Sequence, residues 1–70
     1  MKIFSIRLKE ERKNGGYTQK KMAELLGIPL RTYQNYEMVA KNHREPDQEM
    51  VVKIATVLGV SADYLLGLEN

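Results

Sequence analysis

The 70-residue sequence contains no cysteine, no tryptophan, a single phenylalanine and only two prolines. Without cysteine, neither a disulfide bond nor a cysteine-based metal site is available to stabilise the chain. A chain of this length lies near the lower limit for a self-sufficient core, so its stability must come from well-packed helices, with a partner chain as a further source. We predict one domain over residues 1–70, with a core of Leu, Ile, Val, Met and Tyr side chains.

Long apolar runs are also missing from the sequence. No stretch approaches the roughly 20 apolar residues of a membrane span. The N-terminal residues do not resemble a signal peptide, because charges begin at Lys2 and return at Arg7 and Lys9. These features predict a soluble, cytoplasmic protein that does not associate with membranes.

The net charge of +2 is small, but the charges are unevenly distributed. Residues 1–44 carry ten basic and four acidic side chains, a net charge of +6, whereas residues 45–70 carry one basic and five acidic side chains, a net charge of −4. This polarity favours a polyanionic partner for the first part of the chain. A chance distribution of solvated surface charges would give the same count.

Apolar residues recur at helical spacing, and no segment alternates as a strand would. We predict five helical segments, the first at about residues 3–14. Thr18 and Gly27 bound the second, and Pro29 begins the third. Asp47 begins the fourth segment and Gly59 ends it, and Ser61 begins the fifth. With a polar loop at residues 38–46, the pattern predicts a compact all-α domain.

Residues 18–38 contain two short helical segments separated by Gly27-Ile28-Pro29. Two helices that cross steeply through a tight glycine-containing turn form a helix-turn-helix unit. Ala23 suits the point where the helices come closest, and Gly27 suits a left-handed turn conformation. The apolar face of the first of these helices is predicted to comprise Met22, Ala23, Leu25 and Leu26.

The second helix of this unit is polar on its predicted outer side, where it carries Arg31, Thr32, Gln34 and Asn35. Arg, Gln and Asn have paired donors and acceptors that read base edges in the DNA major groove. Any surface helix is polar on its outer side, so it is the combination with the turn that favours DNA binding.

The order and spacing of these features resemble the phage repressor and Cro-type (XRE-like) helix-turn-helix transcriptional regulators over almost the full chain. The matching residues are Phe4, Leu8, Arg12, Gly16-Tyr17-Thr18-Gln19, Ala23, Gly27, Tyr33, Tyr36-Glu37, Pro46, Ile54-Ala55, Leu58-Gly59-Val60-Ser61 and Asp63-Tyr64-Leu65-Leu66. The resemblance implies a five-helix, lambda-repressor-like domain whose second and third helices bind double-stranded DNA. It also implies a repressor or Cro-like switch of phage or prophage type.

The resemblance further implies roles for individual residues. The base-reading positions are Leu30, Arg31, Thr32, Gln34 and Asn35. Among them we expect Arg31 at a guanine, Leu30 at a thymine methyl group, and Gln34 or Asn35 at an adenine or a phosphate. The phosphate-binding positions are Thr18, Gln19, Lys20, Lys41, Asn42 and Arg44. Arg12 and Glu37 match a structural ion pair, so Glu37 is not expected to act as an acid catalyst.

The sequence departs from the family pattern at several positions. Val39 stands where glycine is common, and the loop between Glu37 and Pro46 is longer than usual. Pro29 occupies a position where Ser or Thr usually caps the recognition helix, so that capping bond is expected to be missing. Gln48 is polar where an apolar residue is common.

No residue pattern indicates an enzyme, a cofactor, a metal site or a small-molecule substrate. His43 is the only histidine and has too few potential ligands nearby. Gly15-Gly16 lacks the Lys-Ser/Thr sequel of a phosphate-binding loop. Ser5 and Ser61 have no adjacent base, and Ser61 is better explained as a helix cap.

Operators in the resembled family are commonly palindromic, which implies a homodimer that reads two half-sites about one DNA turn apart. The dimer would form through a few apolar residues near the C-terminus, and we therefore expect it to be weak. The alternative is a protein-binding antitoxin or antirepressor module, which would need an exposed apolar patch. The same residues are the candidates for both surfaces: Val57, Val60, Leu66 and Leu68.

Overall fold

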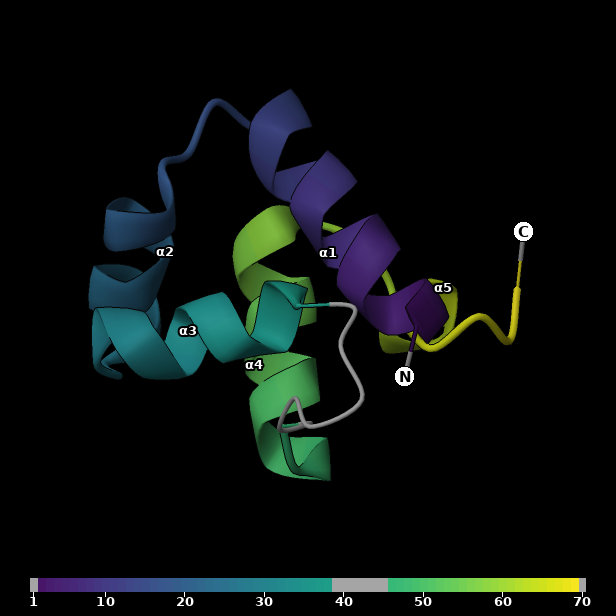
Figure 1. The fold of residues 1–70 in the computed structure, drawn as a ribbon. Coiled ribbons are helices and arrows are strands. Elements are labelled where there is room, and N and C mark those ends of the chain that lie inside the picture. Colours follow the sequence, from purple (N-terminus) through teal and green to yellow (C-terminus); the bar gives the residue numbers. More distant parts are fainter. Residues whose placement is uncertain (1, 39–45, 70) are drawn as a thin grey trace.

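The computed structural model describes residues 2–38 and 46–69. These residues form five helices: α1 (Lys2–Asn14), α2 (Gln19–Leu26), α3 (Leu30–Glu37), α4 (Gln48–Leu58) and α5 (Ala62–Leu65) (Figure 1). The described part of the chain contains no strand. The predicted all-α fold with five helices is therefore confirmed, whereas most of the predicted loop at 38–46, including Val39, lies outside the described residues.

Side-chain caps define the start of three helices. Thr18, Asp47 and Ser61 each accept a hydrogen bond from the backbone N–H three residues further on, at 3.0, 2.8 and 3.0 Å. Each bond satisfies an N–H that has no partner within its own helix. Pro29 precedes α3 without a side-chain capping bond, as its replacement of Ser or Thr predicts.

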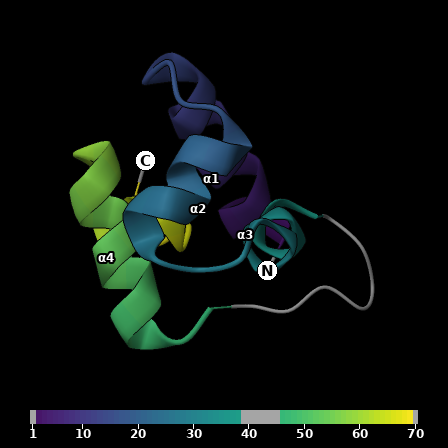
Figure 2. The ribbon, with the colours of Figure 1, turned by 90° about the vertical axis from the view of Figure 1, so that its left-hand side faces the viewer.

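The turn between α2 and α3 depends on Gly27. Its φ of +70° lies in the left-handed region, and its N–H bonds back to the carbonyl oxygens of Ala23 and Glu24. Glycine adopts this conformation without the steric penalty that a Cβ brings. In Figure 2 α3 is seen nearly end-on while α2 runs across the view, so the two helices cross steeply. The turn and the crossing are those of a helix-turn-helix unit.

All five helices contribute to the core. The buried apolar residues are Phe4, Leu8, Met22, Ala23, Leu26, Tyr33, Tyr36, Val51, Ile54, Ala55 and Leu65. Leu25 was predicted on the same apolar face of α2, but it is 40% exposed. The prediction for Leu25 is wrong because Met22, Ala23 and Leu26 already define the inward arc, and helical geometry places position 25 at its edge.

Four apolar residues near the C-terminus are the candidates for an exposed patch, and three of them are partly buried. Val57, Val60 and Leu66 are partly buried against the core, whereas Leu68 is 73% exposed. The sequence shows that these residues are apolar, but it does not show that α4 and α5 bury part of them. Among the described residues, none of the helices is both long and apolar enough to cross a membrane.

Candidate nucleic-acid interface

Helix α3 has a buried side and an outer side. Tyr33, Tyr36 and Glu37 are buried, and they lie within one arc of the helix. The five predicted base-reading residues occupy the remaining arc: Leu30, Arg31, Thr32, Gln34 and Asn35. Leu30 and Arg31 are exposed, whereas the other members are half-buried. One helix face thus carries an apolar side chain, a guanidinium, a hydroxyl and two amides.

The start of α2 lies beside this face and carries a second group of candidates. Helical geometry leaves the N–H groups of Gln19 and Lys20 without intrahelical partners, which makes this end of the helix suited to an anion. Lys20 and Lys21 are both exposed. Lys21 was not among the predicted phosphate-binding residues, although its charge and its position next to Lys20 were signals in the sequence.

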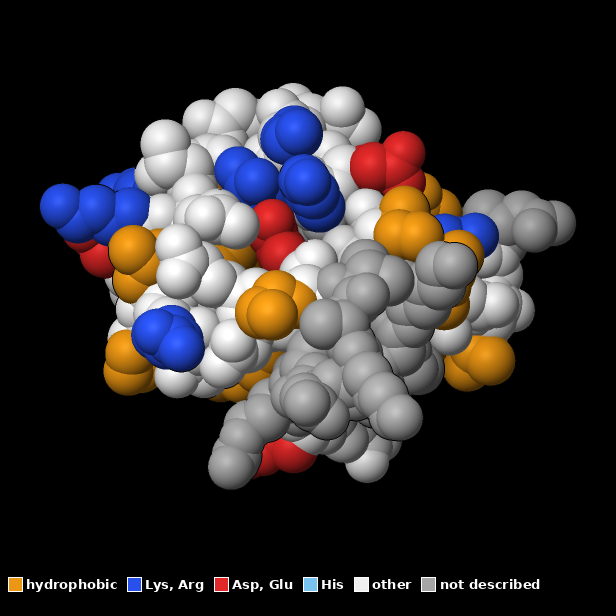
Figure 3. Space-filling view, viewed as in Figure 1, with side chains coloured by type: hydrophobic (Ala, Val, Ile, Leu, Met, Phe, Trp, Pro, Cys, Tyr) orange, Lys and Arg blue, Asp and Glu red, His pale blue; other side chains and the backbone are white. Residues whose placement is uncertain are grey.

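Basic side chains extend this surface beyond α2. Figure 3 shows Lys and Arg side chains gathered over the C-terminal half of α1 and at the edge formed by α2. Lys9 and Lys13 of α1 are exposed, and neither was predicted to bind phosphate. The remaining predicted phosphate-binding residues, Lys41, Asn42 and Arg44, lie outside the described residues, as does His43.

An ion pair fixes the end of α1 to the end of α3. Arg12 Nε donates to Glu37 Oε2 at 2.6 Å, and Arg12 Nη2 donates to Glu37 Oε1 at 3.3 Å. The two side chains are only 10% and 3% exposed. Arg12 Nη1 also donates to the carbonyl oxygen of Tyr17 at 2.9 Å. The hydrogen bond with Glu37 raises the pKa of Arg12 above its ordinary value, so the guanidinium stays charged.

The same carboxylate accepts hydrogen bonds from the two helices of the helix-turn-helix unit. The Tyr33 hydroxyl donates to Glu37 Oε2, and Gln19 Nε2 donates to Glu37 Oε1 at 3.1 Å. Burial, followed by the hydrogen bond to Glu37, raises the pKa of Tyr33 above its ordinary value. Glu37 therefore joins α1, α2 and α3 at one buried point, and its environment suits a structural role.

Gln19 also contacts the outer face of α3. Gln34 Nε2 donates to Gln19 Oε1 at 3.4 Å. Gln19 was predicted only to bind a phosphate, and no sequence pattern indicates its contacts with Gln34 and Glu37. Both polar atoms of its side chain have a protein partner, while its backbone N–H and the second N–H of its amide are available to an anion.

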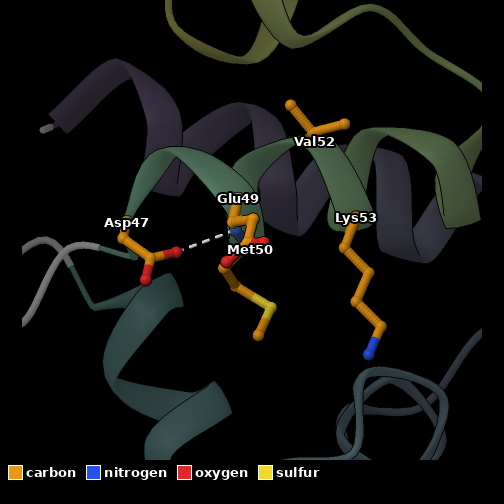
Figure 4. Close-up of a pocket in the computed structure, with 5 residues that line it drawn as sticks. All are labelled: Asp47, Glu49, Met50, Val52 and Lys53. Atoms are coloured by element: carbon orange, nitrogen blue, oxygen red, sulfur yellow. Dashed lines mark hydrogen bonds between the residues drawn. The ribbon is translucent and has the colours of Figure 1, made fainter.

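A hollow at the start of α4 is another concave surface among the described residues. It is lined by Asp47, Glu49, Met50, Val52 and Lys53 (Figure 4). The Asp47 carboxylate caps the N–H of Met50 at 2.8 Å, and Lys53 Nζ donates to the carbonyl oxygen of Leu26 at 3.0 Å. These charged groups already have structural partners. Within residues 2–38 and 46–69, no three His, Cys, Asp or Glu side chains converge as metal ligands would.

The sequence places the chain in a known family. Residues 8–65 match the sequence profile of the family described as helix-turn-helix. The chain therefore belongs to the helix-turn-helix family, and the resemblance to phage repressor and Cro-type regulators is confirmed.

Individual relatives are named as transcriptional regulators. The chain is 46% identical over 64 residues to the HTH-type transcriptional regulator ImmR of Bacillus subtilis (strain 168), a match that covers 91% of this chain and 48% of ImmR. It is 42% identical over 64 residues to the SPbeta prophage-derived HTH-type transcriptional regulator YonR of the same strain, covering 91% and 56%. It is 41% identical over 61 residues to the cryptic phage CTXphi transcriptional repressor RstR of Vibrio cholerae serotype O1, covering 87% and 52%.

The chain spans about half the length of the curated relatives that it matches. No solved structure matches it significantly.

Proposed function

We propose that this chain is the DNA-binding part of a sequence-specific transcriptional regulator, a repressor or Cro-like switch of phage or prophage type. The observation that carries the proposal is the outer face of α3, which presents Arg31 and two amides beside the N-terminal end of α2. Family membership supports it, as do relatives named as prophage-derived or phage regulators. The proposed place of action is the cytoplasm, where the DNA of a bacterial cell lies.

In the proposed complex α3 enters the major groove. Arg31 contacts a guanine through its paired donors, and Leu30 contacts a thymine methyl group. Thr32 and Asn35 border these contacts on the same face. Phosphates are bound at the start of α2 by Thr18, Gln19 and Lys20, where backbone N–H groups and a lysine converge. Lys41, Asn42 and Arg44 are assigned to phosphates from the resemblance to phage repressor and Cro-type regulators alone.

The operator in this proposal is a palindrome read by a weak homodimer. The half-sites lie about one DNA turn apart, because two copies of α3 related by two-fold symmetry enter successive major grooves on one side of the duplex. Leu68, which is 73% exposed, is the best candidate among the C-terminal apolar residues for the contact between copies. Val57, Val60 and Leu66 are partly buried, so they offer less apolar surface for that contact than Leu68 does.

The same burial argues against the alternative of a protein-binding antitoxin or antirepressor module. Such a module needs a contiguous exposed apolar patch. Of the four candidate residues for this patch, three pack partly against the core. The polar face of α3 is better suited to DNA. The proposal includes no catalytic step, because the buried carboxylate of Glu37 is bonded to Arg12, Tyr33 and Gln19.

Selection from a randomised duplex library at moderate salt tests the proposal, with the Arg31→Ala variant selected in parallel. We expect a palindrome from the wild-type chain and the loss of preference at one position in each half-site for the variant. Arg31 is exposed, so its replacement should leave the fold intact, and a circular dichroism spectrum checks this. If the wild-type chain enriches no sequence and is retained weakly at every salt concentration, the proposal is wrong.

A further inference from the structure

We infer that Gln34 selects adenine in the major groove, and that Gln19 is a positioning residue that sets the orientation of the Gln34 amide. This inference rests on the proposed function and deepens it. The resemblance implies an adenine or a phosphate for Gln34 or Asn35, and it leaves open which residue meets the base and how its amide is oriented. The hydrogen bond from Gln19 to Glu37 and the hydrogen bond from Gln34 to Gln19 decide between the two orientations of the Gln34 amide.

The first step is the orientation of Gln19. A carboxylate accepts hydrogen bonds and donates none. Glu37 Oε1 lies 3.1 Å from Gln19 Nε2, and Glu37 Oε2 is paired with Arg12 Nε at 2.6 Å. Gln19 must therefore turn its NH₂ group toward Glu37. Because the oxygen and nitrogen occupy opposite sides of a side-chain amide, its Oε1 is turned away from the carboxylate.

The second step transfers this orientation to α3. Gln19 Oε1 is an acceptor and lies 3.4 Å from Gln34 Nε2. Gln34 must therefore turn its own NH₂ group toward Gln19. An unconstrained glutamine rotates its amide by a half-turn and presents either edge to a ligand. Gln34 is half-buried on the outer face of α3, and the contact with Gln19 favours one of its two amide orientations.

The third step concerns the groups that remain for DNA. An NH₂ group has two hydrogens, so one N–H of Gln34 is left together with its Oε1. Adenine presents an N6–H donor and an N7 acceptor in the major groove, and an amide oxygen with its neighbouring N–H pairs with both. Guanine presents two acceptors and thymine presents one, and these acceptors repel an amide oxygen. Cytosine presents a donor alone. The fixed orientation thus ranks adenine first and cytosine second.

A binding experiment tests the choice of base. Each position of the selected operator is replaced by all four bases, and affinities are measured for the wild-type chain and for Gln34→Ala. We expect one position per half-site where adenine is preferred about tenfold by the wild type and not by Gln34→Ala. Arg31→Ala serves as the control and should lose preference at a different position. If Gln34→Ala retains every preference of the wild type, the assignment to Gln34 is wrong.

The Gln19→Met variant tests the positioning role. Methionine keeps the length of the side chain and its helix propensity, but it removes the amide that links Glu37 to Gln34. We expect the preference for adenine at the Gln34 position to fall several-fold, while preferences at other positions persist. A purely structural or phosphate-binding role for Gln19 would weaken all operators equally and leave these ratios unchanged, which would overturn the positioning role.

A measurement without DNA separates this inference from the proposed function. The ¹⁵N heteronuclear NOE of the Gln34 side-chain amide reports its order in the free protein. We expect the value to fall in Gln19→Met relative to the wild type. Equal values in both proteins overturn the positioning role, whether or not DNA is bound. Absence of sequence-specific DNA binding by the wild type overturns the proposed function and with it the choice of base, even where the amide is ordered.

Discussion

The carboxylate of Glu37 shows how much a single residue contributes to this small core. It is 3% exposed and is paired with Arg12 at 2.6 Å. Replacement of Arg12 by Met leaves the carboxylate buried without its counter-charge. We expect the free energy of unfolding to fall by about 3–5 kcal/mol, because an uncompensated buried charge has lost its solvation and its partner. Urea denaturation followed by circular dichroism measures this change.

A double variant provides the control for that prediction. Arg12→Met combined with Glu37→Leu removes both charges and leaves an apolar contact of similar volume. Replacement of a whole buried pair is often nearly neutral, so the double variant should be more stable than Arg12→Met alone. An Arg12→Met variant as stable as the wild type would show that the pair contributes little.

Ionisation of two tyrosines, Tyr33 and Tyr36, makes the free energy of unfolding depend on pH in the alkaline range. Burial raises the pKa of Tyr33 and of Tyr36 above the ordinary value of 10.0. The unfolded chain releases these protons at lower pH than the folded chain, so their contribution to stability is complete below pH ~10 and is lost as pH rises toward the folded-state pKa values. Each tyrosine increases the rate at which the free energy of unfolding falls with pH by up to about 1.4 kcal/mol per pH unit.

The Tyr33→Phe variant isolates one of these two contributions. Below the ordinary tyrosine pKa it should be less stable than the wild type, because Glu37 loses a hydrogen-bond donor. Above that pKa its stability should fall less steeply with pH than that of the wild type. Urea denaturation at a series of pH values gives both slopes. Identical slopes in the two proteins would show that the Tyr33 hydroxyl ionises equally easily in the folded and unfolded states.

Residue types and spacing were enough to predict some of the site and not the rest. The outer face of α3 follows from helical periodicity, because positions 33, 36 and 37 are buried and the complementary arc faces outward. The contacts of Gln19 with Glu37 and Gln34 depend on the crossing of α2 and α3 to within a fraction of an ångström. A glutamine at a helix start indicates an anion site, but the sequence does not show which neighbour its amide meets.

At the scale of helices, the ends were predictable because their signals are local. Thr18, Asp47 and Ser61 cap helices through bonds to N–H groups three residues away, and Gly27 and Gly59 end helices at φ of +70° and +71°. The error at Leu25 has a different origin. Its exposure depends on which neighbouring helix covers that edge of α2, and this is a property of the tertiary structure.

The turn of the helix-turn-helix unit provides a prediction at this scale. An added Cβ at Gly27 would have no neighbour within 4 Å, and the φ of Gly27 is +70°. Replacement by Ala therefore costs only conformational energy, and we expect the free energy of unfolding to fall by about 1–2 kcal/mol. Thermal and urea denaturation measure the loss.

Asparagine is the matched control at position 27. It tolerates the left-handed conformation better than other residues with a Cβ, so Gly27→Asn should be more stable than Gly27→Ala. If both variants equal the wild type in stability, the left-handed conformation does not determine the choice of glycine at this turn.

For the whole molecule, the charge count predicted a polyanionic partner but not the surface that meets it. The basic residues of the described part separate into exposed side chains on α1, α2 and α3, such as Lys20 and Arg31, and residues with internal partners. Arg7, for example, donates to the carbonyl oxygens of Tyr64 and Glu69 at 2.5 and 2.8 Å. Counting alone treats both groups alike. The ion pair with Glu37 takes Arg12 out of the free positive charge, and the two carbonyl bonds hold Arg7 against α5 and the residues that follow it. The lysines near the start of α2 are left as the proposed phosphate ligands.

The proposed role of Lys20 has a consequence for the salt dependence of DNA binding. Each phosphate neutralised by a protein cation releases counterions, so the logarithm of the association constant falls with the logarithm of salt concentration by about 0.9 per phosphate. Lys20→Gln should reduce this slope by about one phosphate contact and leave the preferred sequence unchanged, since phosphate contacts carry no base information.

Lys53→Gln removes the same charge at the opposite end of α2, where Lys53 bonds to the carbonyl oxygen of Leu26, and should leave the slope unaltered. Fluorescence anisotropy titrations at several salt concentrations compare the three proteins. Equal slopes for all three would remove Lys20 from the interface, and a loss confined to Lys53→Gln would place the DNA against α4 instead.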